Sequence, residues 1–155
     1  YMLLWRTLTD IGLSPYAAKN AYQRERPFMV REETTCTPQD EEALRKDGSY
    51  PSGHTAVGWG WALILTELAP ERAEALLARG RAFGESRNVC NAHWYSDVVA
   101  GRMTGAAAVA KLHSNNEFKA AMQSAREDIA RAREQGLEPT VDCEAEAEAL
   151  ATPLL

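Results

Sequence analysis

The chain has 155 residues, of which 45% are hydrophobic and 25% are charged, a balance typical of one globular domain with a sizeable core. The formal net charge of -5 argues against a nucleic-acid-binding surface and against a polybasic membrane anchor. A local cluster of Lys and Arg would still suit a small anionic substrate. We therefore predict one domain over residues 1–155 that binds neither a nucleic acid polymer nor a membrane.

No apolar run in the chain reaches the roughly 18 residues expected of a membrane span. The best candidate, AVGWGWALIL at 56–65, stops at Thr66 and Glu67, and the run at 98–110 is interrupted by Arg102. The chain also opens without the basic and apolar residues of a leader peptide. We therefore expect no membrane-spanning segment.

Helix signals dominate the first part of the chain. Residues 2–9 resemble the end of an apolar helix, and residues 15–26 predict a second helix with Pro15 near its start. Pro27 ends this helix, because the residue before a proline avoids the helical region. Residues 28–50 are polar and irregular, and a loop of this length in a compact domain is often functional.

Four further helices are predicted, over residues 52–68, 69–86, 93–112 and 117–135. Residues 136–155 are acidic, and we expect them to form a loosely held tail. Because repeats are absent and alternating strand patterns are almost absent, the sequence predicts an all-α fold.

The three cysteines are Cys36, Cys90 and Cys143. They form no CxxC pair, which disfavours a zinc ribbon or a thioredoxin-like site. An odd number permits one disulfide with one free thiol, and it equally permits three unrelated thiols.

The first cluster of candidate site residues is Lys19 and Arg26. They are seven residues apart, so on one continuous helix both would project from the same face. Arg24 and Arg31 look much the same, however. Taken alone, the pair is therefore more typical of a solvated basic stripe.

The second cluster is Pro51-Ser52-Gly53-His54, within the string GSYPSGHT at 48–55. Gly53 lets the backbone approach a ligand closely, and free N–H groups at a helix start favour a phosphate-like anion. Ser52 can cap the helix or donate its hydroxyl to the anion. An ordinary Ser cap with His54 on the surface fits these four residues equally well.

The third cluster lies in SRNVCNAHWYSD at 86–97. His93 and Asp97 are four residues apart, so the carboxylate could fix the tautomer of the imidazole and leave its other nitrogen free to attack or to accept a proton. Arg87 fits the same helical face poorly, so we expect a break between Arg87 and His93. Taken alone, a structural His–Asp pair at a helix start is slightly favoured.

Together the clusters contain the groups that phosphoryl transfer requires. Positive charges and neutral donors can stabilise the equatorial oxygens while one histidine attacks and the other protonates the leaving oxygen. The stabilising groups are Lys19, Arg26, Arg87, Ser52 and Gly53.

The clusters occur in the order Lys-x6-Arg-Pro, Pro-Ser-Gly-His and Ser-Arg-x5-His-x3-Asp. This pattern resembles the signature of the type 2 phosphatidic acid phosphatase and vanadium haloperoxidase superfamily. The strings GSYPSGHT, RPF and GESRNVCNAHWYSDV resemble the class A bacterial non-specific acid phosphatases in particular. The similarity extends from about residue 12 to about residue 125.

The resemblance implies a metal-independent acid phosphatase that hydrolyses phosphomonoesters, with nucleotides among the candidate substrates, and that needs no cofactor. His93 would form a phosphohistidine, Asp97 would orient it, and His54 would protonate the leaving alcohol. Vanadate would occupy the phosphate pocket. The residues implied to hold the phosphoryl oxygens are Lys19, Arg26, Ser52, Gly53 and Arg87.

The resemblance also implies a compact helical bundle of the acid phosphatase and vanadium haloperoxidase type. Because Lys19 lies near the start, we expect this chain to be the C-terminal portion of that fold, without the family's N-terminal helices. A periplasmic location and a homo-oligomer are implied as well. The periplasm is oxidising, so a Cys36–Cys90 disulfide becomes a hypothesis, whereas Cys143 lies outside the matched region and receives no role.

Three alternatives remain open. The chain could be a vanadium-dependent haloperoxidase, which its short length and the string GSYPSGHT disfavour. It could be an inactive, anion-binding fragment of a phosphatase. A metallohydrolase with His54, His93 and Asp97 as ligands is disfavoured, because the three basic residues would repel a cation.

Overall fold

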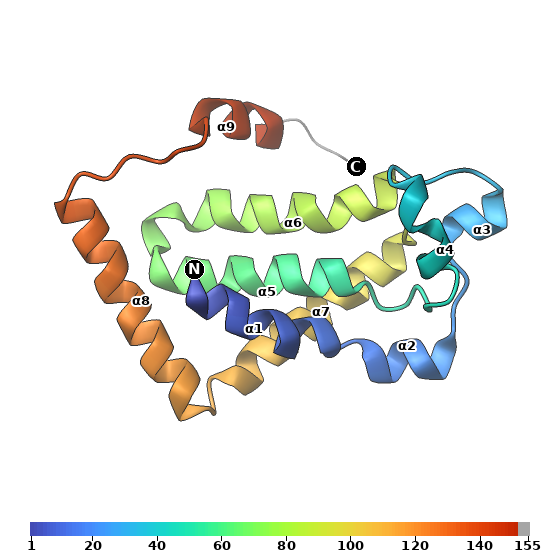
Figure 1. Cartoon of the computed structure of the whole chain (residues 1–155), viewed down its shortest axis with the longest axis horizontal. Coiled ribbons are helices and arrows are strands. Elements are labelled where there is room, and N and C mark those ends of the chain that lie inside the picture. The colour runs from blue at the N-terminus through green and yellow to red at the C-terminus, as the bar shows by residue number, and fades with distance from the viewer. Residues whose placement is uncertain (152–155) are drawn as a thin grey trace.

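The structure of the protein, a computed structural model, describes residues 1–151, and residues 152–155 lie outside that description. All the regular elements of the described residues are helices, and these residues contain no strand (Figure 1). The predicted all-α fold is therefore confirmed.

Three long helices form the centre of the molecule: α5 (Gly53–Leu68), α6 (Ala73–Val89) and α7 (Tyr95–Leu112). Figure 1 shows α6 running alongside α5, while α7 packs across α5. Glycine makes the second contact possible, since a Cβ atom on Gly101 of α7 would lie only 2.6 Å from the carbonyl oxygen of Ser52. This close approach brings the starts of α5 and α7 together.

The hydrophobic core lies between this central group and the two helices α1 (Met2–Leu13) and α8 (Asn116–Glu134). Apolar side chains at helical spacing on α1, α5, α7 and α8 are removed from water, which is the main stabilising contribution to the fold. The buried residues of this core are Leu3, Ile11, Ala56, Ile64, Leu68, Val109, Phe118 and Met122.

The helix predicted over residues 15–26 is shorter than expected. Helix α2 (Tyr16–Tyr22) ends where Gln23 adopts a left-handed conformation with φ of 43°. Arg26 then has an extended backbone and is the N-cap of a separate helix, α3 (Pro27–Arg31), which Pro27 can begin but could not continue. The prediction that Lys19 and Arg26 project from one helical face is therefore wrong.

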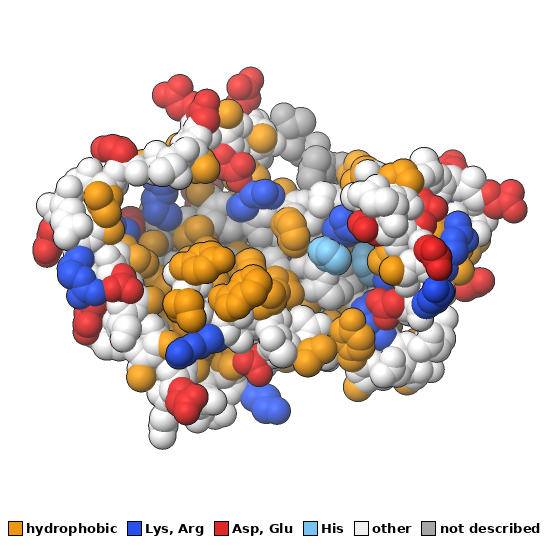
Figure 2. All heavy atoms as spheres, viewed as in Figure 1, with side chains coloured by type: hydrophobic (Ala, Val, Ile, Leu, Met, Phe, Trp, Pro, Cys, Tyr) orange, Lys and Arg blue, Asp and Glu red, His pale blue; other side chains and the backbone are white. Residues whose placement is uncertain are grey.

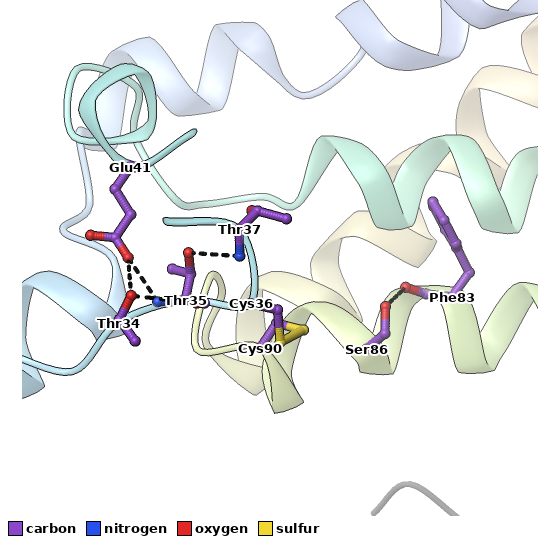
Figure 3. Close-up of a disulfide and its surroundings, with 8 residues drawn as sticks. All are labelled: Thr34, Thr35, Cys36, Thr37, Glu41, Phe83, Ser86 and Cys90. Atoms are coloured by element: carbon purple, nitrogen blue, oxygen red, sulfur yellow. Dashed lines mark hydrogen bonds between the residues drawn. A yellow bond between two sulfur atoms is a disulfide. The ribbon is translucent and has the colours of Figure 1, made fainter. Parts of the chain in front are cut away.

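The segment predicted as an irregular loop over residues 28–50 is partly helical. It contains α3, the 3-10 helix η1 (Pro38–Asp40) and the short helix α4 (Glu41–Leu44). Glu41 stabilises the segment by accepting hydrogen bonds from the Thr34 hydroxyl at 2.9 Å and the Thr35 amide at 2.8 Å (Figure 3).

A disulfide joins Cys36 of this segment to Cys90, which directly follows α6 (Figure 3). Their Cα atoms are 5.0 Å apart, within the ordinary range for a disulfide. The bond ties the segment to the end of α6, as the hypothesis from the resemblance required. Cys143 is a free thiol on the surface.

The other predicted helices are present with slightly shifted ends, and the 3-10 helix η2 (Pro70–Arg72) precedes α6. The predicted tail, residues 136–155, contains the helix α9 (Cys143–Ala151), and its last four residues lie outside the description. Glu146 of α9 forms a 2.6 Å ion pair with Arg79 of α6. Within the described residues, every helix is too short or too polar to cross a membrane.

Candidate active site

The residues singled out from the sequence gather at one end of the three central helices. The starts of α5 and α7 and the end of α6 meet α2, α3 and α4 there (Figure 1). Figure 2 shows histidine atoms, in pale blue, within a hollow on this side, with Lys and Arg side chains close by. Two helix N-termini therefore point their partial positive charge toward one polar hollow.

His93 lies in the short connection between α6 and α7 and is buried, with 2% of its surface exposed. Its Nε2 atom is 3.1 Å from Arg26 Nη1, and its Nδ1 atom is 3.4 Å from Asp97 Oδ2. Arginine can only donate, so Nε2 must carry the lone pair and Nδ1 the proton. Burial lowers the pKa of His93 to about 4, so the ring is neutral at neutral pH.

Asp97 is fully buried in the first turn of α7 and has three polar neighbours. Its Oδ2 atom accepts a 2.9 Å hydrogen bond from the Trp94 amide and faces His93, and its Oδ1 atom accepts a 2.7 Å bond from Arg24. Burial by itself would raise the pKa of Asp97. The contacts with His93, the Trp94 amide and Arg24 outweigh it, so the pKa is lowered and the carboxylate stays ionised.

Ser52 is buried and caps α5. Its hydroxyl oxygen accepts from the Thr55 amide at 3.3 Å and from the Thr55 hydroxyl at 2.9 Å, while its own amide donates to the Asp97 carbonyl at 3.0 Å. The amide of Ser52 thus fixes the start of α5 against the start of α7. In the described chain, the amides of Gly53 and His54 have no acceptor and remain free to bind an anion.

His54 occupies the first turn of α5 and is exposed on one side. On its other side the ring lies 6.4 Å from the ring of Phe83 on α6. Partial burial, together with the positive charges of Arg87, Arg26 and Lys19, lowers the pKa of His54. An exposed histidine next to these cations can exchange a proton with a group bound between them.

Arg87 lies in the last turn of α6, and its carbonyl accepts the amides of Ala92 and His93, both at 3.1 Å. This turn supplies the predicted break between Arg87 and His93. The Nε atom of Arg87 is buried without a hydrogen-bond partner in the described part of the protein. A buried guanidinium nitrogen without an acceptor points to an anionic ligand.

Lys19 and Arg26 are brought together by the segment that follows α4. Lys19 Nζ donates to Asp47 Oδ2 at 3.0 Å and also to the Gly48 carbonyl, and Arg26 Nη2 donates to the same Asp47 oxygen at 3.1 Å. Only 3% of the surface of Lys19 and 1% of that of Arg26 is exposed. Burial lowers the pKa of both side chains.

Two residues of this site were not identified from the sequence. The sequence pattern does not distinguish Arg24 from the neighbouring basic residues, yet Arg24 pairs with Asp97 and its guanidinium lies 5.4 Å from the ring centre of Trp94. Asp47 was not singled out at all. Its position directly before the string GSYPSGHT was the only available signal, because its partner Lys19 is 28 residues away in the sequence.

In the described residues, no group of three or more His, Cys, Asp and Glu side chains is placed to hold a metal ion. The arrangement combines a neutral buried imidazole, a carboxylate on its far nitrogen, three basic side chains and free amides. Such a set can bind a tetrahedral oxyanion and attack its central atom.

Residues 2–119 match the family model described as the PAP2 superfamily, which covers most of the chain. The chain therefore belongs to the PAP2 superfamily.

Curated relatives narrow this assignment. The chain is 48% identical over 124 residues to an acid phosphatase of Zymomonas mobilis, covering 80% of this chain and 46% of the relative. It is 46% identical over 132 residues to a non-specific acid phosphatase of Providencia stuartii, covering 84% and 53%. A non-specific acid phosphatase of Salmonella typhimurium is 50% identical over 113 residues, covering 73% and 45%.

These matches confirm the resemblance to bacterial non-specific acid phosphatases and are consistent with class A. The chain spans about half the length of the curated relatives it matches.

Proposed function

We propose that the chain forms the active site of a metal-independent acid phosphatase that hydrolyses phosphomonoesters through a phosphohistidine. The observation that carries this proposal is the environment of His93. Its unprotonated Nε2 atom faces the guanidinium of Arg26, a group that commonly binds phosphate, while its protonated Nδ1 atom faces the ionised Asp97. The acid phosphatases among the relatives support the same reaction.

In the first step, the lone pair on Nε2 of His93 attacks phosphorus, and the bond from phosphorus to the ester oxygen breaks. The imidazole becomes positively charged as the new bond forms, and Asp97 stabilises that charge through the Nδ1 proton. His54 gives its proton to the departing alkoxide, which leaves as an alcohol.

In the second step, a water molecule attacks phosphorus and the bond to Nε2 breaks. His54, now neutral, accepts a proton from the water, which restores both histidines and releases phosphate. Throughout, positive charge and free amides stabilise the equatorial oxygens. The groups that provide this are Lys19, Arg26 and Arg87, with the Gly53 amide and the Ser52 cap at the start of α5.

The three basic side chains also support metal independence, because they would repel a divalent cation from the same hollow. The Cys36–Cys90 disulfide supports an oxidising compartment such as the periplasm, where bonds of this kind persist. We propose further that orthovanadate binds in place of phosphate and that the whole protein is a homo-oligomer.

The test is hydrolysis of p-nitrophenyl phosphate at mildly acid pH in the presence of chelator, with and without orthovanadate. We expect turnover that resists chelator and is blocked by vanadate. His93→Ala should abolish both turnover and trapping of a phosphoenzyme. The control His113→Ala changes a half-exposed histidine that pairs with Glu67 away from the site.

Other outcomes would change the assignment. Loss of activity in chelator would reject metal independence. Phosphate binding by a folded chain without turnover would identify an inactive anion-binding fragment, and halide oxidation that depends on vanadate and peroxide would identify a haloperoxidase. Normal turnover by His93→Ala would refute the nucleophile.

A further inference from the structure

Asp47 occupies an unusual position for a carboxylate in a phosphate-binding site. A single oxygen, Oδ2, accepts from Lys19 Nζ at 3.0 Å and from Arg26 Nη2 at 3.1 Å. Both cations are almost fully buried, whereas 36% of the Asp47 side chain is exposed. The carboxylate therefore lies between solvent and the two buried cations.

The two cations do not depend on this carboxylate for their positions. Lys19 also donates to the Gly48 carbonyl. Arg26 Nε donates to the carbonyls of Leu44 at 3.0 Å and of Asp47 at 3.1 Å, and Arg26 Nη1 donates to the Ala92 carbonyl at 3.1 Å. Because backbone carbonyls orient both side chains, the principal contribution of the Asp47 carboxylate is its negative charge.

One oxygen bridging a lysine and an arginine is also the arrangement expected of a phosphoryl oxygen in this site. A phosphate that binds Lys19 and Arg26 must either displace the Asp47 carboxylate or bind beside it against charge repulsion. Either case lowers the affinity of the site for phosphate. We propose that Asp47 is an internal counter-ion that competes with phosphate for Lys19 and Arg26 and so weakens retention of the product. The inference rests on the proposed function in that it takes phosphate as the product.

The experiment is a calorimetric titration of the wild-type chain and of Asp47→Asn with inorganic phosphate. Asparagine keeps the size and an acceptor oxygen but removes the charge, so we expect phosphate to bind about tenfold more tightly to the variant. The inhibition constant of phosphate in p-nitrophenyl phosphate hydrolysis should fall by the same factor.

The matched control is Glu42→Gln, which removes one negative charge from the neighbouring α4. Among the described residues Glu42 is exposed and pairs only with Lys46, at 3.0 Å, so its replacement should leave phosphate affinity within about twofold of wild type. If thermal unfolding shows that Asp47→Asn does not fold, Asp47→Ser provides the same removal of charge.

Each outcome decides the question. Equal affinity in wild type and Asp47→Asn overturns the competition, and weaker binding by the variant shows instead that the carboxylate positions the cations. Tighter binding by the variant without any turnover keeps the inference and rejects the proposed function. If neither chain binds phosphate, both the inference and the anion site are rejected.

Discussion

The burial of His93 predicts a pH dependence of stability that one substitution should remove. In the folded chain the pKa of His93 is about 4, whereas in the unfolded chain it is close to the ordinary 6.5. Between these values the unfolded state binds a proton that the folded state does not. The free energy of unfolding is therefore unaffected above pH 6.5 and falls as the pH decreases toward 4, by roughly 3 kcal/mol from this residue.

The measurement is urea unfolding of wild type and His93→Gln at about pH 7.5 and about pH 4.5, monitored by circular dichroism. We expect the wild type to lose roughly 2–3 kcal/mol more than the variant between the two conditions. Asp97 does not obscure the comparison, because its pKa is lowered below the ordinary 3.8 and it stays ionised over this range. His113→Gln is the control, since His113 is a half-exposed histidine whose side chain is 42% exposed.

An equal pH dependence in wild type and His93→Gln would refute this reasoning. It would mean that the folded protein accommodates a proton on His93 as readily as the unfolded chain does. The neutral imidazole that the proposed mechanism needs would then have no energetic basis in burial. If His113→Gln instead removed the pH dependence, the effect would belong to His113 and not to His93.

Four further predictions concern the histidines, Arg24 and the disulfide. The pH profile of kcat/KM should be bell-shaped. Its acid limb should have a midpoint near pH 4, where His93 is protonated, and its alkaline limb a midpoint below about pH 6.5, where His54 loses its proton. A maximum above pH 7 would contradict this prediction. His54→Ala should slow esters of poorly leaving alcohols by about 100-fold more than p-nitrophenyl phosphate, and equal losses would show that His54 is not the acid. Arg24→Ala should lower kcat about tenfold and shift the acid limb of the profile, with partial rescue by Arg24→Lys; an unshifted limb would limit Arg24 to a structural role. Cys90→Ser opens a disulfide that spans 54 residues and should reduce the free energy of unfolding by about 4 kcal/mol, measured by urea unfolding without reductant; an unchanged value would show that the bond adds no stability.

The helical class and most of the candidate site could be predicted from the sequence because their signals are local. Apolar spacing identified the central helices, and the resemblance selected the two histidines and their neighbours. The pair Lys19 and Arg26 was identified for the wrong reason, since the chain leaves the helix at Gln23. A left-handed glutamine leaves no mark in a helical pattern, because nothing in its residue type requires that conformation.

What the sequence by itself determined is most of the chemical groups in the candidate site, and the helices that carry His54 and Asp97. Only the tertiary structure decided which of these groups meet and which others join them. Arg24 contacts Asp97 across 73 residues, and Asp47 contacts Lys19 across 28. Such contacts depend on how closely α5 and α7 approach at Gly101 and on how the segment after α4 folds back over α2. Packing between distant segments sets these distances, and no periodicity within one segment records them.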